Sequence, residues 1–595
     1  MQKRKNKWLR ILKEVRQYKK DAVLSPLCTI LCVILEILIP YLTASIIDRG
    51  IAVGNMGHVV KTGALMAVMA VLAMFFGIQA GRHTARAATG FACNLRQAMF
   101  SRIQDYSFAN IDRFSTAGLV TRLTTDVTNM QNAFQMMLMM MTRAPVTLIV
   151  ALVMAISISA RLSVVFLGAM AFLIFMIGIL MPMAMKYFHQ MFRKYDAVNE
   201  SIKENVGAIR VVKAYVREAY ESSRFQKAVT ELYNNSISAE RIVSLNAPVM
   251  MMTVYACILL ISWFGAQMIV KGTGLTTGQL TSLLSYVMNI LISLMMLSMV
   301  FVMITQSAAA AQRIDEVLEE APDIVSPEKP LLSVKDGSID FDHVTFSYTK
   351  GSGRPVLSDV DLHIHSGETV GIIGGTGSSK SSLVNLISRL YDVNEGCVRV
   401  GGEDVRKYDL TVLRSAAAVV LQKNVLFSGT ILENLRWGNP DATEEECREA
   451  CRMACADEFI ERMPEGYETR IERGGTNVSG GQKQRLCIAR ALVGKPKILI
   501  MDDSTSAVDT ATDARIRSAL KNAAPETTKL IIAQRISSVE DADRVLVMDD
   551  GKIAAFDTPE RLLETCEIYR EVYESQKQNG GGDFDEAAAK GGDRK

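Results

Sequence analysis

Six long apolar stretches dominate the first half of the 595-residue chain. The length of each stretch is close to that of an α-helix that crosses the hydrocarbon core of a bilayer, about 20 residues, and each stretch carries few charges. The six spans exclude a soluble protein, and their even number returns the chain to the side of the membrane on which it starts. The predicted membrane spans are 22–47, 59–80, 136–158, 162–185, 248–270 and 280–304.

The charges around these spans predict their orientation. Residues 1–20 hold nine Lys/Arg and one Glu, and the apolar side chains among them predict an amphipathic helix on the inner membrane surface. Long basic segments, 81–135 and 186–247, alternate with short outer loops. Basic segments stay inside, so we expect a multi-pass protein of the cytoplasmic membrane with both termini in the cytoplasm.

The two inner segments show helical spacing and few helix breakers, over 82–106 and 201–241. Membrane helices are therefore predicted to continue far into the cytosol. Polar turns are expected near 110–116 and 195–205, where the tips would contact a soluble domain.

Glu36 and Arg143 fall inside predicted spans, and an ionisable group in hydrocarbon is a functional candidate. For Glu36, lining a cavity and bonding to a neighbouring helix both stay open. Arg143 is expected near the inner interface, where its long side chain can reach water. The run Met136–Met141 could line an adaptable cavity, but packing against lipid or helices is favoured.

Prolines at 322, 327 and 330 mark a linker over 321–335. Residues 336–577 then alternate short β-branched runs with helical patterns, which predicts an α/β domain with a mainly parallel sheet. The tail, 578–595, is rich in Gly and charge and is expected to be disordered. The fold class is thus an all-α six-helix transmembrane domain with long intracellular helices, followed by an α/β domain. The predicted strands contain residues 370–373, 418–421, 498–501, 530–533 and 545–548.

A glycine-rich loop between the first of these strands and a helical pattern predicts a phosphate cradle. Backbone N–H groups of such a loop and of the helix start face an anion, and a lysine adds positive charge. A following serine hydroxyl can bind Mg²⁺, so ATP and Mg²⁺ are the expected cofactors. The candidate residues are Gly374, Thr376, Gly377, Ser378, Ser379, Lys380, Ser381 and Ser382.

A buried strand ending in two carboxylates follows the loop by about 120 residues in the same domain. Asp502 at the strand end can hold Mg²⁺ through oxygen ligands and water. Asp503 stands where a general base for an attacking water is expected.

Overall charge and cysteines add two expectations. The net charge of +3 gives no case for nucleic acid as a partner. Ten scattered cysteines are expected to be reduced. Cys447, Cys451 and Cys455 recur every four residues on one helix face, where packing is favoured over a metal site because no His is near.

The segment 477–485, Asn-Val-Ser-Gly-Gly-Gln-Lys-Gln-Arg, resembles the signature motif of ABC transporter ATPases. The resemblance covers nearly the whole chain and implies further roles. Tyr348 matches the aromatic that stacks on adenine, and Gln422 matches the glutamine that contacts the nucleotide and Mg²⁺ and links them to the membrane domain. Ser506-Ala507-Val508-Asp509 matches the loop that crosses to a partner ATPase domain. The signature residues assigned to the nucleotide are Ser479, Gly480, Gly481 and Gln482.

By this resemblance the chain is a half-transporter of the exporter type, and two such chains share each ATP site across their interface. Segments 112–126 and 205–224 resemble the regions that couple the membrane and ATPase domains. The implied activity is ATP-driven export of a small amphipathic molecule, a lipid or a peptide.

Three departures from the family pattern fall on this chain's half of its own site. Ser379 replaces a loop glycine, Asp503 stands where Glu is usual, and Gln534 stands where His is usual. Asp is one methylene shorter than Glu, which draws its carboxylate back by roughly 1–1.5 Å. With the signature motif intact, the chain resembles the degenerate-site subunit of a heterodimeric multidrug-type exporter. The alternatives are a slow homodimer in which Asp503 still acts as base, and a nucleotide-gated sensor or accessory subunit.

Overall fold

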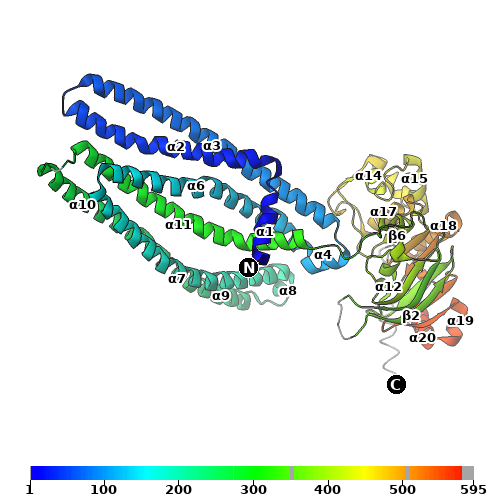
Figure 1. The fold of residues 1–595 in the computed structure, drawn as a ribbon. Coiled ribbons are helices and arrows are strands. Elements are labelled where there is room, and N and C mark those ends of the chain that lie inside the picture. The colour runs from blue at the N-terminus through cyan, green and yellow to red at the C-terminus, as the bar shows by residue number, and fades with distance from the viewer. Residues whose placement is uncertain (1, 273, 349–353, 504–507, 579–595) are drawn as a thin grey trace. The chain divides into compact units, whose positions relative to one another are not determined.

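The structure is a computed structural model that describes residues 2–272, 274–348, 354–503 and 508–578 (Figure 1). The chain divides into two compact units. The helical unit contains Met1–Gln104 and Thr116–Glu320, and the α/β unit contains Asp105–Ser115 and Ala321 onward. The predicted tail lies outside the described residues, apart from Gln578.

The helical unit is built almost entirely from long helices (Figure 1). Six of its described helical segments are long and apolar enough to cross a membrane, as the sequence predicts. Its α-helices are α1 (Gln2–Lys13), α2 (Lys19–Ser45), α3 (Met56–Gln104), α5 (Thr116–Thr121), α6 (Val127–Ile158), α7 (Ala160–Gly207), α8 (Ile209–Ala214), α9 (Glu218–Ser244), α10 (Asn246–Val270) and α11 (Thr277–Glu319).

Several helices extend well beyond the apolar spans, and this prediction is confirmed. α3 continues to Gln104, and α7 continues to Gly207, so each is roughly twice as long as its membrane span. The turn expected over 195–205 is wrong, because helical hydrogen bonding persists to Gly207 and the chain turns only after it. Polar residues on an exposed helix face explain the misplaced turn, since polarity by itself does not end a helix.

The core of the helical unit joins α2, α6, α7, α10 and α11. Pro40 lies inside α2 and removes one backbone donor from it. Two α11 side chains donate to α2 carbonyls beside this point: Ser282 Oγ to Pro40 O at 2.6 Å, and Tyr286 OH to Ile37 O at 3.0 Å. A neighbouring helix thus adds polar contacts beside the proline, where α2 continues with one backbone donor fewer.

Glu36 and Arg143, from the first and third predicted spans, pair with each other. Arg143 Nη2 on α6 donates to Glu36 Oε2 on α2 at 2.6 Å. Between the two possibilities for Glu36, the structure therefore shows a bond to a neighbouring helix. The charge of Arg143 is met by this carboxylate, and its expected place near the inner interface stays a prediction.

Helix α1 packs against the end of α11. Ile11 and Val15, just after it, are buried, and Arg10 forms ion pairs with Asp315 at 3.4 Å and Glu319 at 3.5 Å. The apolar side predicted for this segment therefore contacts protein along at least part of its length.

The α/β unit is organised around a six-stranded sheet in the order β12-β11-β3-β10-β9-β6. All five predicted strands belong to this sheet, and they pair in parallel as expected. β12 pairs antiparallel at one edge. The strands of the sheet are β3 (Thr369–Gly374), β6 (Ala417–Val420), β9 (Ile498–Asp502), β10 (Thr528–Ile532), β11 (Arg544–Asp549) and β12 (Lys552–Asp557).

A second sheet of four strands, in the order β2-β1-β4-β5, is antiparallel and was not predicted. It shares a core with one face of the parallel sheet. Its strands are β1 (Ile339–Phe346), β2 (Leu357–Ile364), β4 (Glu395–Val400) and β5 (Glu403–Asp404), and a separate pair joins β7 (Gly429–Thr430) to β8 (Arg470–Ile471).

Helices complete the α/β unit. Cys447 and Cys451 on α15 are buried with Cys455 in one hydrophobic core, so the packing interpretation is confirmed. No group of three potential metal-binding side chains occurs in the described part of the chain. The helices are α4 (Phe108–Phe114), α12 (Lys380–Ile387), α13 (Leu410–Ala416), α14 (Ile431–Leu435), α15 (Glu444–Met453), α16 (Asp457–Ile460), α17 (Gly480–Val493), α18 (Thr510–Ala523), α19 (Pro559–Thr565) and α20 (Glu567–Gln578).

Candidate nucleotide site

The glycine-rich loop connects the end of β3 to the start of α12, as the sequence predicts. Gly374 has φ +156°, and a Cβ there would lie 2.3 Å from Met548 O, so only glycine fits. The Lys380 ammonium lies over the loop and donates to the carbonyls of Gly374 at 2.8 Å and Gly375 at 2.9 Å. The loop thus gathers backbone donors and one cation at a helix start, which suits a phosphate group.

Ser379 occupies a left-handed backbone conformation, with φ 74° and ψ 21°. This geometry explains why a glycine is usual at its position, since glycine reaches positive φ without a steric penalty. A residue with a Cβ is strained there by about 1–2 kcal/mol. A serine at this position therefore stores strain in the loop.

We expect Ser379→Gly to raise the thermal unfolding temperature of the protein and to strengthen ATP binding. Relief of strain is partly offset by the greater freedom of glycine in the unfolded chain, which leaves a net gain of about 0.5–1 kcal/mol. Thermal unfolding and nucleotide titration would measure both effects. Ser358→Gly in β2, where φ is not positive, is the control and should lower stability. A lower unfolding temperature of the Ser379→Gly variant would contradict the claim that the backbone of Ser379 is strained.

Ser381 and Asp502 come together although they are 121 residues apart. Ser381 Oγ donates to Asp502 Oδ1 at 3.0 Å, and Asp502 is 8% exposed at the end of β9. Burial raises the pKa of the Asp502 carboxyl, while the Ser381 hydrogen bond and the Lys380 charge oppose this shift. A hydroxyl and a carboxylate oxygen at this distance are the kind of donor set that Mg²⁺ prefers.

Asp503 and Gln534, the two unusual residues of the site, are in direct contact. Gln534 Nε2 donates to Asp503 Oδ2 at 3.3 Å. Asp503 has φ 46° immediately after β9, and its N–H donates to Ile532 O at 3.0 Å. The parallel pairing of β9 with β10 thus brings the two departures to the same edge of the sheet.

Two glutamines that the sequence analysis missed support this pair. Gln576 on α20 is buried, donates to Gln534 O at 3.0 Å and accepts from Ile536 N at 2.9 Å. Gln484 on α17 donates to Asp503 O at 3.4 Å. Gln484 lies inside the signature segment 477–485, but the family resemblance assigned it no contact with Asp503, and Gln576 belongs to no recognised motif. Only the packing of α17 and α20 reveals these two roles.

Tyr348 lies beside the loop with its ring about half exposed. Its hydroxyl and Ser382 Oγ are 2.8 Å apart, and its ring meets those of Phe346 and Tyr391 edge to face. An anchored aromatic with a free face can stack on a base, so the predicted adenine contact stays a prediction with suitable geometry.

The signature serine begins helix α17. Ser479 Oγ accepts from Gln482 N at 3.3 Å, and Gln482 Oε1 accepts from Ser479 N at 2.9 Å, which is a capping box. Ser479 and Gly480 are exposed at this helix start. Among the described residues, no contact joins Ser479 or Gly480 to the glycine-rich loop of the same chain. This agrees with a role at the ATP site of another chain.

Three further candidate positions are Gln422, Asp509 and the segment Ser506–Ala507. Gln422 is exposed two residues after β6. Asp509 begins α18, where its side chain accepts from Thr512 N at 2.9 Å, and this hydrogen bonding lowers the pKa of its carboxyl. Ser506 and Ala507 lie outside the described residues.

Helix α4, from the first cytosolic segment, belongs to the α/β unit. Tyr391 donates to Asp112 Oδ2 at 2.7 Å, and the rings of Tyr391 and Phe108 meet at 6.1 Å. Since Tyr391 also touches Tyr348, a chain of aromatic contacts connects α4 to the side of the glycine-rich loop.

The fold and the site define a membrane protein with a nucleotide-binding domain, and comparisons with known proteins identify the family. Residues 23–309 match the protein family described as "ABC transporter transmembrane region", and residues 357–506 match the family described as "ABC transporter". The chain is 36% identical to an uncharacterized ABC transporter ATP-binding protein of Mycobacterium tuberculosis, Rv1273c, over 94% of this chain and 97% of that protein. It is 35% identical to the uncharacterized ABC transporter ATP-binding protein YfiB of Bacillus subtilis, over 91% and 94%.

Two further comparisons concern export. The chain is 32% identical to the multidrug efflux ATP-binding/permease protein Rv0194 of Mycobacterium tuberculosis, over 96% of this chain and 47% of that protein. A solved bacterial Atm1-family ABC exporter with ATP bound superposes with a TM-score of 0.79 at 25% identity, covering 94% of this chain and 98% of that one. The chain belongs to the ABC transporter family, as an exporter half-transporter whose membrane domain is fused to its ATPase domain. It is a multi-pass membrane protein, and its ATPase domain binds ATP.

Proposed function

We propose that this chain is the degenerate-site subunit of a heterodimeric ABC exporter in the cytoplasmic membrane. Its own loop holds ATP that is hydrolysed slowly, and its signature motif completes the fast site of a partner chain. The observation that carries the proposal is the contact between Asp503 and Gln534. The short carboxylate is held by an amide that has no titratable proton near neutral pH, where a longer base and a histidine are usual.

The site retains what binding requires. Lys380 and the loop suit the phosphates, and the paired oxygens of Ser381 and Asp502 suit Mg²⁺. We infer that these two residues hold Mg²⁺ with help from Gln422, and that Tyr348 stacks on the adenine. Bound Mg²⁺ would neutralise phosphate charge. The chain thus binds ATP but lacks well-placed groups to hydrolyse it.

Two exposed features support a partner chain. Ser479 at the start of α17 is available to donate to the phosphate of a nucleotide held by another chain. The region around α8, at the second cytosolic tip, exposes apolar side chains that a partner's ATPase domain would cover. The exposed apolar residues of this tip are Ile209, Val211, Tyr215 and Val216.

We infer an amphipathic small molecule, a lipid or a peptide as the exported substrate, moved outward by alternating access with both termini in the cytoplasm. The long cytosolic helices support coupling between the two domains, since α4 packs on the ATPase domain beside Tyr391. This coupling favours a transporter over a sensor.

The decisive experiment purifies the epitope-tagged chain from native membranes together with an untagged copy. We expect a second half-transporter with Glu and His at the two positions to copurify, and the untagged copy to be absent. In the purified pair, Asp503→Ala should leave most substrate-stimulated ATP hydrolysis, and replacing the partner's Glu should abolish it. Copurification of the untagged copy, or equal losses from both changes, would overturn the proposal in favour of a homodimer.

A further inference from the structure

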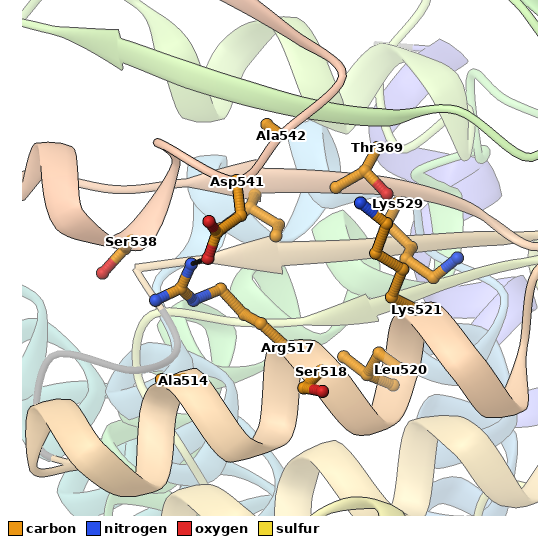
Figure 2. A pocket seen from close by; sticks show the side chains of 11 residues that line it. Thr369, Ala514, Arg517, Ser518, Leu520, Lys521, Lys529, Ser538, Asp541 and Ala542 are labelled. Carbon is orange, nitrogen blue, oxygen red and sulfur yellow. Dashed lines mark hydrogen bonds and ion pairs between the residues drawn. The ribbon is translucent and has the colours of Figure 1, made fainter. Parts of the chain in front are cut away.

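A polar cavity lies in the ATPase domain, between helix α18 and the first residues of β3 and β10 (Figure 2). Its volume is about 230 Å³, below the roughly 300–1,000 Å³ of pockets that enclose drug-sized ligands. It therefore suits a small ion or metabolite better than a nucleotide. The polar side chains that line it include Thr369, Arg517, Lys521, Lys529, Ser538 and Asp541.

This cavity is distinct from the ATP site. Thr369 and Lys529 stand near the amino ends of β3 and β10, where they pair directly. The glycine-rich loop and Gln534 follow the carboxyl ends of the same two strands. Because the strands are parallel, the two sites lie at opposite edges of the sheet.

Lys529 is a buried cation that no described carboxylate pairs with at ion-pair distance. It is 3% exposed, and its Nζ donates to the carbonyls of Ala524 at 2.7 Å and Thr527 at 2.8 Å. An ammonium has three donors, so one N–H has no acceptor among the described residues. Burial lowers the pKa of Lys529, and the field of Asp543 acts against this shift. A buried charge without a counter-ion is costly, and an anion in the cavity would stabilise it.

A second cation lies on the same side. Lys521 in the last turn of α18 is exposed and has no hydrogen bond or ion pair with any described side chain. Figure 2 shows the two lysine side chains and the Thr369 side chain together at one side of the cavity. The lining contributes two lysines and a threonine on this side of the cavity and no carboxylate. Asp543, outside the lining, accepts from Thr369 N at 2.8 Å.

The cation on the opposite side of the cavity already has counter-ions. Arg517 donates to Asp541 Oδ2 at 2.8 Å and pairs with Asp513 Oδ2 at 3.3 Å. Ser538 Oγ donates to Asp513 at 3.1 Å. The cations of the described lining that form no ion pair are therefore Lys521 and Lys529.

We propose that this cavity is a binding site for a small multivalent anion, a phosphate or a carboxylate, held by Lys521, Lys529 and Thr369. The proposal does not depend on whether the transporter is a heterodimer. It differs from the ATP site in position and in its lack of a glycine-rich loop.

The test uses the full-length transporter with its ATP sites saturated by a non-hydrolysable ATP analogue and Mg²⁺. Equilibrium dialysis with radiolabelled inorganic phosphate should reveal one saturable site per chain. Lys521→Met should weaken phosphate binding about tenfold, because one charge-assisted contact is lost, and Lys529→Met should abolish it. Lys521 is exposed, so its replacement leaves the fold intact.

Lys552→Met, an exposed lysine on β12 outside the cavity, is the matched control and should bind phosphate as the natural protein does. Competition with succinate distinguishes the ligand classes: displacement of phosphate indicates a site for carboxylates as well, and no displacement indicates a site specific for phosphates. The absence of saturable binding of either anion, or equal phosphate affinity in Lys521→Met and Lys552→Met, would overturn the proposal.

Discussion

Replacing Asp503 with Glu and Gln534 with His should raise ATP hydrolysis at this chain's own site by about 10²-fold. The added methylene advances the carboxylate toward the attacking water, and a misplacement of about 1 Å can cost a factor of that size. The histidine replaces the amide that now donates to Asp503 Oδ2. Phosphate release would be measured in a complex whose partner site has been inactivated by replacing its Glu.

The single variants and a distant control separate the two contributions. Asp503→Glu should account for most of the increase in the rate of ATP hydrolysis. Gln534→His by itself should raise this rate little, since the histidine then faces the short carboxylate of Asp503. Asp441→Glu, an exposed change in the turn before α15, should leave the rate unchanged. A double variant no faster than the natural chain would show that this site is slow for another reason.

Removing either member of the Glu36–Arg143 pair should destabilise the membrane domain by about 2–4 kcal/mol, because the other charge is left without a partner among apolar helices. The side chains are 42% and 33% exposed in the chain by itself, so in a bilayer this surface meets lipid, a cavity or another chain. Thermal unfolding in detergent and the yield of membrane-inserted protein would measure the loss. The exchange of both residues, E36R/R143E, should restore most of the stability.

The chain supplies a matched control for this prediction. Lys194 and Glu231 pair at the same 2.6 Å, with side chains 45% and 59% exposed on the cytosolic extensions of α7 and α9. Breaking this exposed pair should cost about 0.2–1 kcal/mol. Equal costs for the two pairs, or no rescue by the exchange, would show that membrane depth adds nothing to the Glu36–Arg143 contact.

The parallel sheet was predictable because its strands are buried on both faces and appear as continuous apolar runs. The antiparallel sheet was not predicted, although Ile339, Phe341, Val344 and Phe346 carry the inward positions of β1. A shift in register between Phe341 and Val344 breaks the alternation that would have revealed this strand.

The six spans, the long cytosolic helices and the nucleotide motifs could all be read from the sequence. These features depend on local apolar length, helical period and residue types at short spacing, which the chain displays directly. The partners across long separations are visible only in the folded protein. It paired Glu36 with Arg143, joined Asp503 to Gln534, and left Lys529 buried beside a cavity without a counter-ion. Such contacts depend on the register of neighbouring strands and on the packing of helices, and neither can be read from spacing along the chain.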